Sequence, residues 1–128
     1  MFCSGIDNGL IELRCAPGPE ICEADIVIVA VQTPTNDAGE PQLQAVEDVL
    51  SKIVSSIEKR KHSLIVSIRS TILPEAFKRL ERFCEEHSSE ISLVMNPEFL
   101  RESTAVRDFF HPPFCVAGGS DLSAVKAV

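Results

Sequence analysis

The sequence predicts an α/β protein built around a parallel β-sheet. Three observations carry this prediction: short apolar runs rich in Val and Ile, amphipathic helical patterns between them, and polar segments directly after them. Apolar runs without alternation are typical of strands covered on both faces, and strands that alternate with helices favour parallel pairing. The chain has 128 residues, so we expect residues 1–128 to form a single domain.

Residues 26–31 give the clearest strand signal, because the run is continuous and mostly β-branched. Residues 63–68, 91–95 and 114–117 give shorter versions of the same signal. A weaker strand is expected at residues 11–15.

Two longer segments between the strands have helical periodicity. Residues 42–59 place apolar side chains three and four positions apart. Residues 74–87 repeat this pattern, and Pro74 suits a first helical turn because its missing N–H is no loss there. We also expect a short helix over residues 98–108 and about one turn at 19–24.

The charge of the chain argues against nucleic-acid binding. The chain has 19 acidic and 12 basic residues and a net charge of −7, whereas phosphate contacts need clustered Lys and Arg. The only basic run, residues 59–61, is short. The longest apolar run is also far too short to span a bilayer. We expect no nucleic acid and no membrane among the partners.

The cysteines and histidines give no metal-site pattern. The five cysteines include no C-x-x-C pair, and no histidine lies at metal-ligand spacing from a cysteine. Free thiols in a reducing compartment are the simpler interpretation. The N-terminus also lacks the basic-then-apolar pattern of a signal peptide. We expect no metal and a cytoplasmic protein.

Three polar segments follow the expected strands, at residues 32–37, 69–74 and 96–104. Ligands of open α/β sheets bind outside the carboxyl ends of the strands. If the strands are parallel neighbours, these three segments meet at one edge of the sheet and form a site.

The side chains in these segments allow two interpretations. On a helix, Glu98 and Glu102 would lie on one face, either as a charged first turn stabilised by the helix dipole or as a carboxylate that polarises a water molecule. The hydroxyls of Thr33, Ser70 and Thr71 are either turn formers or donors to a ligand. No G-x-S-x-G elbow and no G-x-G-x-x-G fingerprint occurs in the sequence.

Three motifs in order resemble the UDP-glucose/GDP-mannose dehydrogenases. They are Ala-Asp-Ile-Val-Ile-Val-Ala-Val-Gln-Thr-Pro-Thr-Asn-Asp at 24–37, Arg-Ser-Thr-Ile-Leu-Pro at 69–74, and Asn-Pro-Glu-Phe-Leu-Arg-Glu-Ser-Thr-Ala-Val-Arg-Asp-Phe at 96–109. The second and third motifs look slightly more like the GDP-mannose branch. The resemblance covers about residues 11–119.

The resemblance implies a three-layer, Rossmann-like parallel sheet and NAD as cofactor. It also implies oxidation of a nucleotide-sugar alcohol to the uronic acid, and a nucleotide sugar as substrate. By position, Glu98 and Thr71 match catalytic residues, with Glu98 acting on the water or the thioester. The cofactor-binding matches are Thr33, Pro34, Ser70, Thr71 and Glu102, and the substrate-binding matches are Phe99, Leu100 and Arg101.

The sequence departs from the family pattern in ways that matter for activity. It lacks the first βα units with the glycine-rich turn, and none of its cysteines matches the nucleophile of the family. Gln32 replaces a small residue and Glu75 replaces a glycine. We therefore expect the truncated, distal half of an NAD-binding domain, with weak or absent NAD binding and no activity by itself. The alternative is a non-catalytic binding or assembly module that keeps the fold.

In the family, the strand at residues 26–31 pairs with the first strand, which is absent here. An uncovered strand edge presents unpaired N–H and C=O groups. We therefore expect a homodimer, formed through this edge or through a swapped N-terminal segment.

Overall fold

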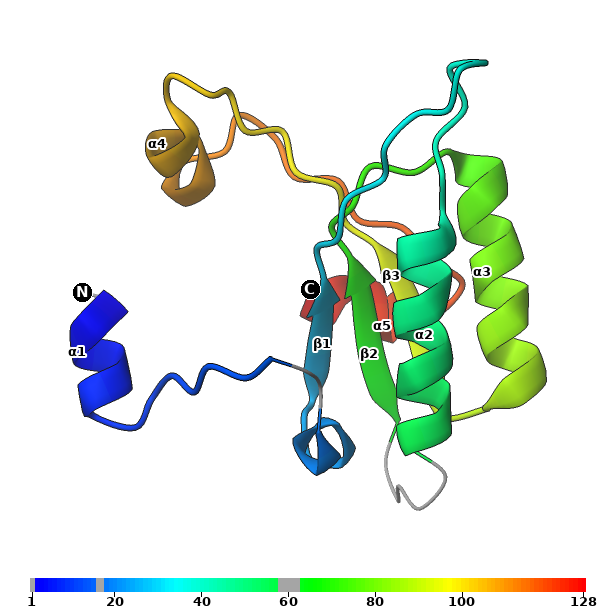
Figure 1. Cartoon of the computed structure of the whole chain (residues 1–128), viewed down its shortest axis with the longest axis horizontal. Coiled ribbons are helices and arrows are strands. Elements are labelled where there is room, and N and C mark those ends of the chain that lie inside the picture. Colours follow the sequence, from blue (N-terminus) through cyan, green and yellow to red (C-terminus); the bar gives the residue numbers. More distant parts are fainter. Residues whose placement is uncertain (1, 16–17, 58–62) are drawn as a thin grey trace.

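The protein contains a three-stranded parallel sheet with β2 in the centre (Figure 1). The strands are β1 (Ile26–Val29), β2 (Leu64–Ile68) and β3 (Ile91–Met95), in the order β1-β2-β3. This arrangement confirms the predicted α/β class. The computed structural model describes residues 2–15, 18–57 and 63–128.

The register aligns the carboxyl ends of the three strands. Val29 lies opposite Ile68, and Ile68 lies opposite Met95. The ladder continues one step further, because Arg69 N donates to Val29 O at 2.8 Å and Asn96 N donates to Ile68 O at 2.9 Å. The segments that follow the strands therefore start from the same edge of the sheet.

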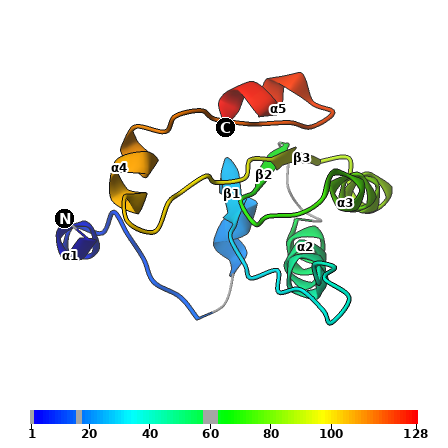
Figure 2. The same cartoon turned by 90° about the horizontal axis from the view of Figure 1, so that it is seen from above.

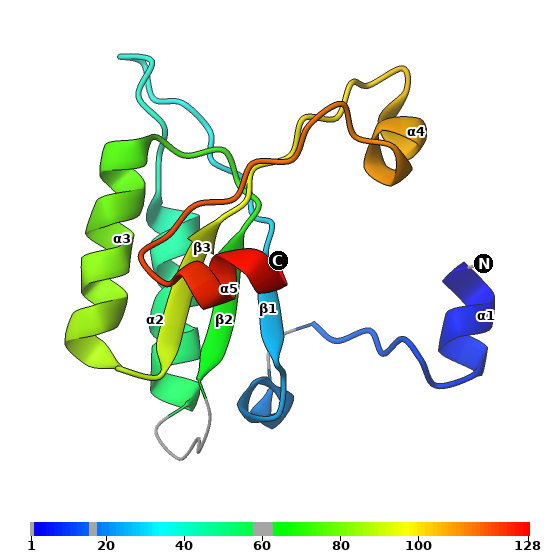
Figure 3. The same cartoon turned by 180° about the vertical axis from the view of Figure 1, so that it is seen from behind.

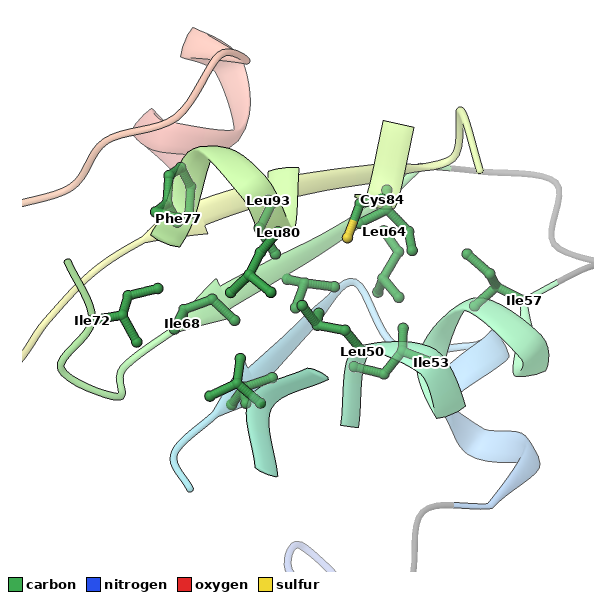
Figure 4. Packing of buried hydrophobic residues seen from close by; sticks show 14 of the residues in the cluster. Leu50, Ile53, Ile57, Leu64, Ile68, Ile72, Phe77, Leu80, Cys84 and Leu93 are labelled. Atoms are coloured by element: carbon green, nitrogen blue, oxygen red, sulfur yellow. The ribbon is translucent and has the colours of Figure 1, made fainter. Parts of the chain in front are cut away.

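Two helices cover one face of the sheet, α2 (Gln44–Ser56) and α3 (Pro74–His87) (Figure 2). Their apolar sides pack against alternate residues of the strands and form the core (Figure 4). Pro74 occupies the first turn of α3, as the sequence predicts. The most deeply buried side chains are Val46, Leu50, Ile53, Ile57, Leu64, Val66, Ile68, Cys84 and Val94.

The opposite face carries only the short helix α5 (Leu122–Ala127), which packs against β3 (Figure 3). Asp121 caps α5 by accepting hydrogen bonds from two backbone N–H groups of its first turn. Gly119 brings the chain close to β3, since a Cβ there would lie 2.6 Å from Leu93 O. On β1, the side chain of Ile28 stays 65% exposed.

The other elements lie outside these layers. The 3-10 turn η1 (Pro19–Cys22) matches the turn expected at 19–24, whereas α1 (Phe2–Asp7) and α5 were not predicted. Helix α4 (Ala105–Phe110) belongs to a lobe that projects away from the sheet (Figure 1). The base of this lobe is closed by two hydrogen bonds between Met95 and Gly118, of 2.7 and 2.9 Å.

Two predicted strands were wrong. Residues 114–117 form no strand; the chain there makes a single antiparallel bridge to β3, at Gly118. Residues 11–15 also lack strand structure, since no neighbouring segment supplies backbone partners for them. The strand expected at 26–31 ends at Val29, where the chain turns toward the polar segment that follows.

The helix predicted over 98–108 was also wrong in extent, because only α4 forms. The helix predicted at 42–59 is shorter, and its last positions, the basic run 59–61 and His62 lie outside the described residues. In the part of the chain that the structure describes, no helix has the length and apolar character needed to cross a bilayer.

Candidate functional site

The segments that follow the three strands form one cleft at the carboxyl edge of the sheet. Its volume is about 290 Å³. It brings Thr33 from the segment after β1 together with Thr71 from the segment after β2 and Glu98 from the segment after β3. The three positions are far apart in sequence, and the predicted convergence is confirmed. The other lining residues are Ala30, Val31, Gln32, Arg69 and Ser70.

The two threonines are linked through one hydrogen bond. Thr33 Oγ1 donates to the carbonyl oxygen of Thr71 at 3.0 Å. Within the described residues, the hydroxyl of Thr71 has no hydrogen-bond partner, and this residue is exposed. The Thr71 hydroxyl is therefore the one that can serve a ligand directly, while Thr33 fixes the distance between the two segments.

Ser70 is buried at the same edge, and its hydroxyl has two partners. Ser70 Oγ accepts a hydrogen bond from Val31 N at 3.0 Å and donates one to Val31 O at 2.7 Å. The side chain thus replaces the ladder beyond the end of β1. A structural role accounts for this serine, and its contact with a cofactor stays a prediction.

A group of polar side chains joins the ends of β2 and β3. The Arg69 guanidinium donates through Nη1 to Asn96 Oδ1, and its Nη2 lies 3.6 Å from Glu98 Oε2. Asn96 is buried, and its amide nitrogen also lies 3.9 Å from Cys115 Sγ. The sequence reasoning missed Arg69 and Asn96. Their position directly after two buried strands was the available signal.

A second crevice, of about 220 Å³, lies between the two sides of the projecting lobe. Phe99 and Leu100 line it, and the ring of Phe99 packs against that of Phe114 with centroids 4.6 Å apart. Arg69 and Glu98 line both this crevice and the cleft with the threonines. The Arg69–Glu98 pair therefore forms the wall between the two hollows.

The segment that precedes α4 is folded around Asp108, whose side chain is 3% exposed. Its carboxylate accepts hydrogen bonds from Arg101 N, Arg101 Nε, Arg101 Nη2 and Thr104 Oγ1, at 2.7–3.2 Å. These hydrogen bonds, first those from Arg101 and then that from Thr104, hold the pKa of Asp108 well below its usual range. Asp108 is a further organising residue that the sequence reasoning missed.

This arrangement overturns the expectation that Glu98 and Glu102 share a helical face. The chain between them closes onto Asp108 instead of continuing as a helix, and α4 begins only at Ala105. Glu102 lines a separate hollow beside α4. The sequence spacing therefore described a helix that the Asp108 contacts replace.

The remaining predicted site residues lie outside the cleft. Pro34 stands at the base of a turn, where its carbonyl oxygen accepts a hydrogen bond from Gln42 N at 2.7 Å. Arg101 turns toward Asp108, away from the residues that line the cleft. Among the described residues, no group of three or more His, Cys, Asp or Glu side chains could hold a metal ion.

Comparison with known proteins gives a consistent result. Residues 8–128 match the family model described as "UDP-glucose/GDP-mannose dehydrogenase family, NAD binding domain". A GDP-mannose 6-dehydrogenase of Pseudomonas putida is 34% identical over 128 aligned positions, which cover 94% of this chain and 29% of that protein. A UDP-glucose 6-dehydrogenase of Rickettsia felis is 31% identical over 99 positions, covering 77% of this chain and 21% of that protein.

The fold agrees with solved structures of the same kind. A UDP-glucose dehydrogenase from Pyrobaculum islandicum superimposes with a TM-score of 0.82 at 28% identity, covering 98% of this chain and 30% of that one. The chain thus spans less than a third of the length of these three relatives.

Proposed function

Because this chain belongs to the UDP-glucose/GDP-mannose dehydrogenase family, we propose that its carboxyl-edge cleft binds the nicotinamide half of NAD. The observation that carries the proposal is the presence of Thr33, Thr71 and Glu98 in one cleft. Their hydroxyl and carboxylate oxygens are suitable partners for the carboxamide and ribose hydroxyls of the cofactor. The volume of about 290 Å³ suits one ring and its ribose rather than a whole dinucleotide.

The roles of the residues follow their places in the structure. Thr71 donates to the nicotinamide side of the cofactor, and Glu98 acts on the water that hydrolyses the thioester in the complete enzyme. Phe99, Leu100 and Arg101 line the substrate side. Ser70, Pro34 and Glu102 act less directly, because Ser70 holds the strand ends and the other two lie outside the cleft. NAD, when bound, supplies the hydride acceptor.

We propose that this chain is the distal half of a Rossmann-type NAD-binding domain and belongs to a nucleotide-sugar 6-dehydrogenase. The sequence contains no G-x-G-x-x-G turn to hold the pyrophosphate. A half-site loses that contribution, while the entropic cost of association remains. Binding of NAD is therefore weak, and the chain by itself does not turn over UDP-glucose or GDP-mannose.

An NMR titration with NAD tests the cleft. We expect saturable shifts at Thr33, Thr71 and Glu98 with a Kd on the order of 1 mM. Thr71→Val should weaken binding about threefold or more, since one hydrogen bond is lost. Thr35→Val, in the neighbouring turn outside the cleft, is the matched control and should leave the Kd unchanged. Shifts that avoid the cleft, or none at all, would refute the proposal.

The second candidate is a non-catalytic binding or assembly module. It is favoured by Gln32, which lines the cleft, and by Glu75, which stands in the first turn of α3. Both residues are larger than those expected from the family. Reduction of NAD in the presence of either nucleotide sugar would exclude this candidate. Complete lack of NAD binding in a folded chain would favour it.

For partners, we propose that the chain forms a homodimer through the free edge of β1. Among the described strands, β1 has a neighbour on one side only (Figure 1). Its side chains are uncharged, and Ile28 is exposed. Two β1 edges related by a two-fold axis can pair in antiparallel fashion and satisfy each other's N–H and C=O groups.

Light scattering after size-exclusion chromatography tests this dimer. Ile28→Lys should convert a dimer into a monomer, because a charge blocks an edge strand. Leu122→Lys on α5 is the control, since Leu122 is similarly exposed, at 71%, but lies on the far side of β3. A dimer that survives Ile28→Lys but dissociates when residues 1–15 are removed would indicate a swapped N-terminal segment. A wild-type monomer would refute both forms.

We also propose that the protein resides in the cytoplasm. Cys15, Cys84 and Cys115 are free thiols, as is usual in a reducing compartment. Cell fractionation would test the location directly, and recovery outside the cytoplasm would refute it.

A further inference from the structure

Arg69 is held from three directions at the edge of the sheet. Its backbone N–H donates to Val29 O, its Nη1 donates to Asn96 Oδ1, and its Nη2 faces Glu98 Oε2 at 3.6 Å. The side chain is only 25% exposed. The guanidinium is therefore ordered by groups of two neighbouring strands before it meets the Glu98 carboxylate.

The anchor of this arrangement is Asn96, which is 1% exposed. Its backbone N–H extends the ladder between β2 and β3, so its amide cannot move without disturbing the sheet. Surface ion pairs usually contribute little, because two mobile side chains must be ordered together. Here Asn96 has already ordered Arg69. Only the Glu98 side chain, 51% exposed, still has to be fixed.

The position of Glu98 matters because it borders two hollows. Both the threonine cleft and the aromatic crevice of the lobe include Arg69 and Glu98 in their walls. A carboxylate released from Arg69 could turn toward solvent or toward either hollow. Kept beside Arg69, it stays at the rim of the cleft that holds Thr71. There it can accept a charge-assisted hydrogen bond from a carboxamide or a ribose hydroxyl.

We propose that Arg69 is a positioning residue, which fixes the Glu98 carboxylate at the rim of the cleft and so raises the affinity of the cleft for the nicotinamide half of NAD. This inference rests on the proposed function. It assigns to Arg69 an effect exerted through Glu98, not a direct contact with the ligand. The competing explanation is that the guanidinium attracts the phosphates of the cofactor itself.

A double-mutant cycle separates the two explanations. NAD affinity is measured for the wild type, Arg69→Met, Glu98→Gln and the double variant. We expect Arg69→Met to weaken binding about fivefold in the wild-type background and to have no further effect once Glu98 is Gln. Arg69→Lys, which keeps a donor near Glu98, should recover part of the affinity. An equal loss in both backgrounds would mean direct contact and would overturn the inference.

The matched control is Arg79→Met. Arg79 pairs with Glu47 at 2.7 Å between α3 and α2, away from the cleft. This variant also removes an Arg–Glu pair, and it should leave NAD affinity unchanged. Arg69→Lys keeps the cycle informative if Arg69→Met does not fold. A uniform loss in both arginine variants would overturn the inference.

A measurement without ligand distinguishes failure of this inference from failure of the proposed function. Backbone ¹⁵N order parameters at Glu98 and Phe99 should fall from about 0.85 toward 0.6 in Arg69→Met and stay unchanged in Arg79→Met. If the wild type binds no NAD but this drop occurs, the proposed function fails and the positioning of Glu98 by Arg69 stands. If the order parameters do not change, the inference fails whether or not NAD binds.

Discussion

The hydroxyl group of Ser70 holds both main-chain polar groups of Val31, accepting from its N–H and donating to its carbonyl oxygen. One side chain on the β2 side therefore continues the pairing that the backbone ends at Val29. This contact keeps the segment after β1 beside the segment after β2, and with it the two threonines of the cleft.

Replacement of Ser70 should destabilise the protein. Ser70→Ala leaves part-buried N–H and C=O groups without partners, so we expect a loss of about 1–3 kcal/mol in the free energy of unfolding. Urea denaturation measures this loss. Ser51→Ala is the control, because the Ser51 hydroxyl makes one hydrogen bond on the exposed side of α2. Equal losses in the two variants would contradict the prediction.

The stability contributed by Asp108 should depend on pH. Its pKa is lowered in the folded protein, first by hydrogen bonds from Arg101. An unfolded Asp titrates at about 3.9, so the contribution is complete above that value and is lost as pH falls below it. The stability difference between wild type and Asp108→Asn should be constant from about pH 7 to 5 and shrink below about pH 4. Asp48→Asn, on the exposed face of α2, should show little difference.

The thiols should differ in reactivity. Burial, followed by the charges of Glu81 and Glu85, raises the pKa of Cys84 to about 11, so little thiolate forms at pH 8. Iodoacetamide should modify the exposed Cys15 and Cys115 in the native protein and reach Cys84 only after unfolding. Peptide mass spectrometry reads the sites directly. Rapid native modification of Cys84 would show that α3 opens from the sheet.

Removal of a buried hydroxyl should stabilise the sheet. Ser67 in β2 is 1% exposed, and among the described residues its Oγ has no hydrogen-bond partner. Ser67→Ala should therefore raise the free energy of unfolding by about 1 kcal/mol, seen as a higher Tm. Ser92→Ala in β3 should have the opposite sign, because the Ser92 hydroxyl donates to Asp121 at 2.8 Å.

The sequence predicted elements well where local pattern and tertiary contact agree. The bounds of α3 and β3 match the prediction, because Pro74 starts the helix and the apolar residues of β3 are buried in the sheet. Residues 114–117 have the composition of a strand but lie in the lobe, with Phe114 and Val116 exposed. A strand requires a partner, and composition does not reveal whether one is available.

The candidate site followed the same rule. The meeting of Thr33, Thr71 and Glu98 could be predicted, because parallel strands place their following segments at one edge. The contacts of Arg69 and Asp108 could not, since each joins side chains whose distance depends on the three-dimensional path of the chain. Four-residue spacing suggested a helical pair of glutamates, and the Asp108 hydrogen bonds replaced that helix with a folded loop.

The two hydrogen bonds between Met95 and Gly118 have a consequence for protein engineering. They bring together the entry and exit of the α4 lobe, and within the lobe, residues 97–117, Asp108 is the only buried residue. The lobe therefore behaves as a cassette inserted between β3 and α5. A short turn grafted in its place should leave the sheet, α2 and α3 folded, which would give a minimal scaffold on which new recognition loops could be displayed.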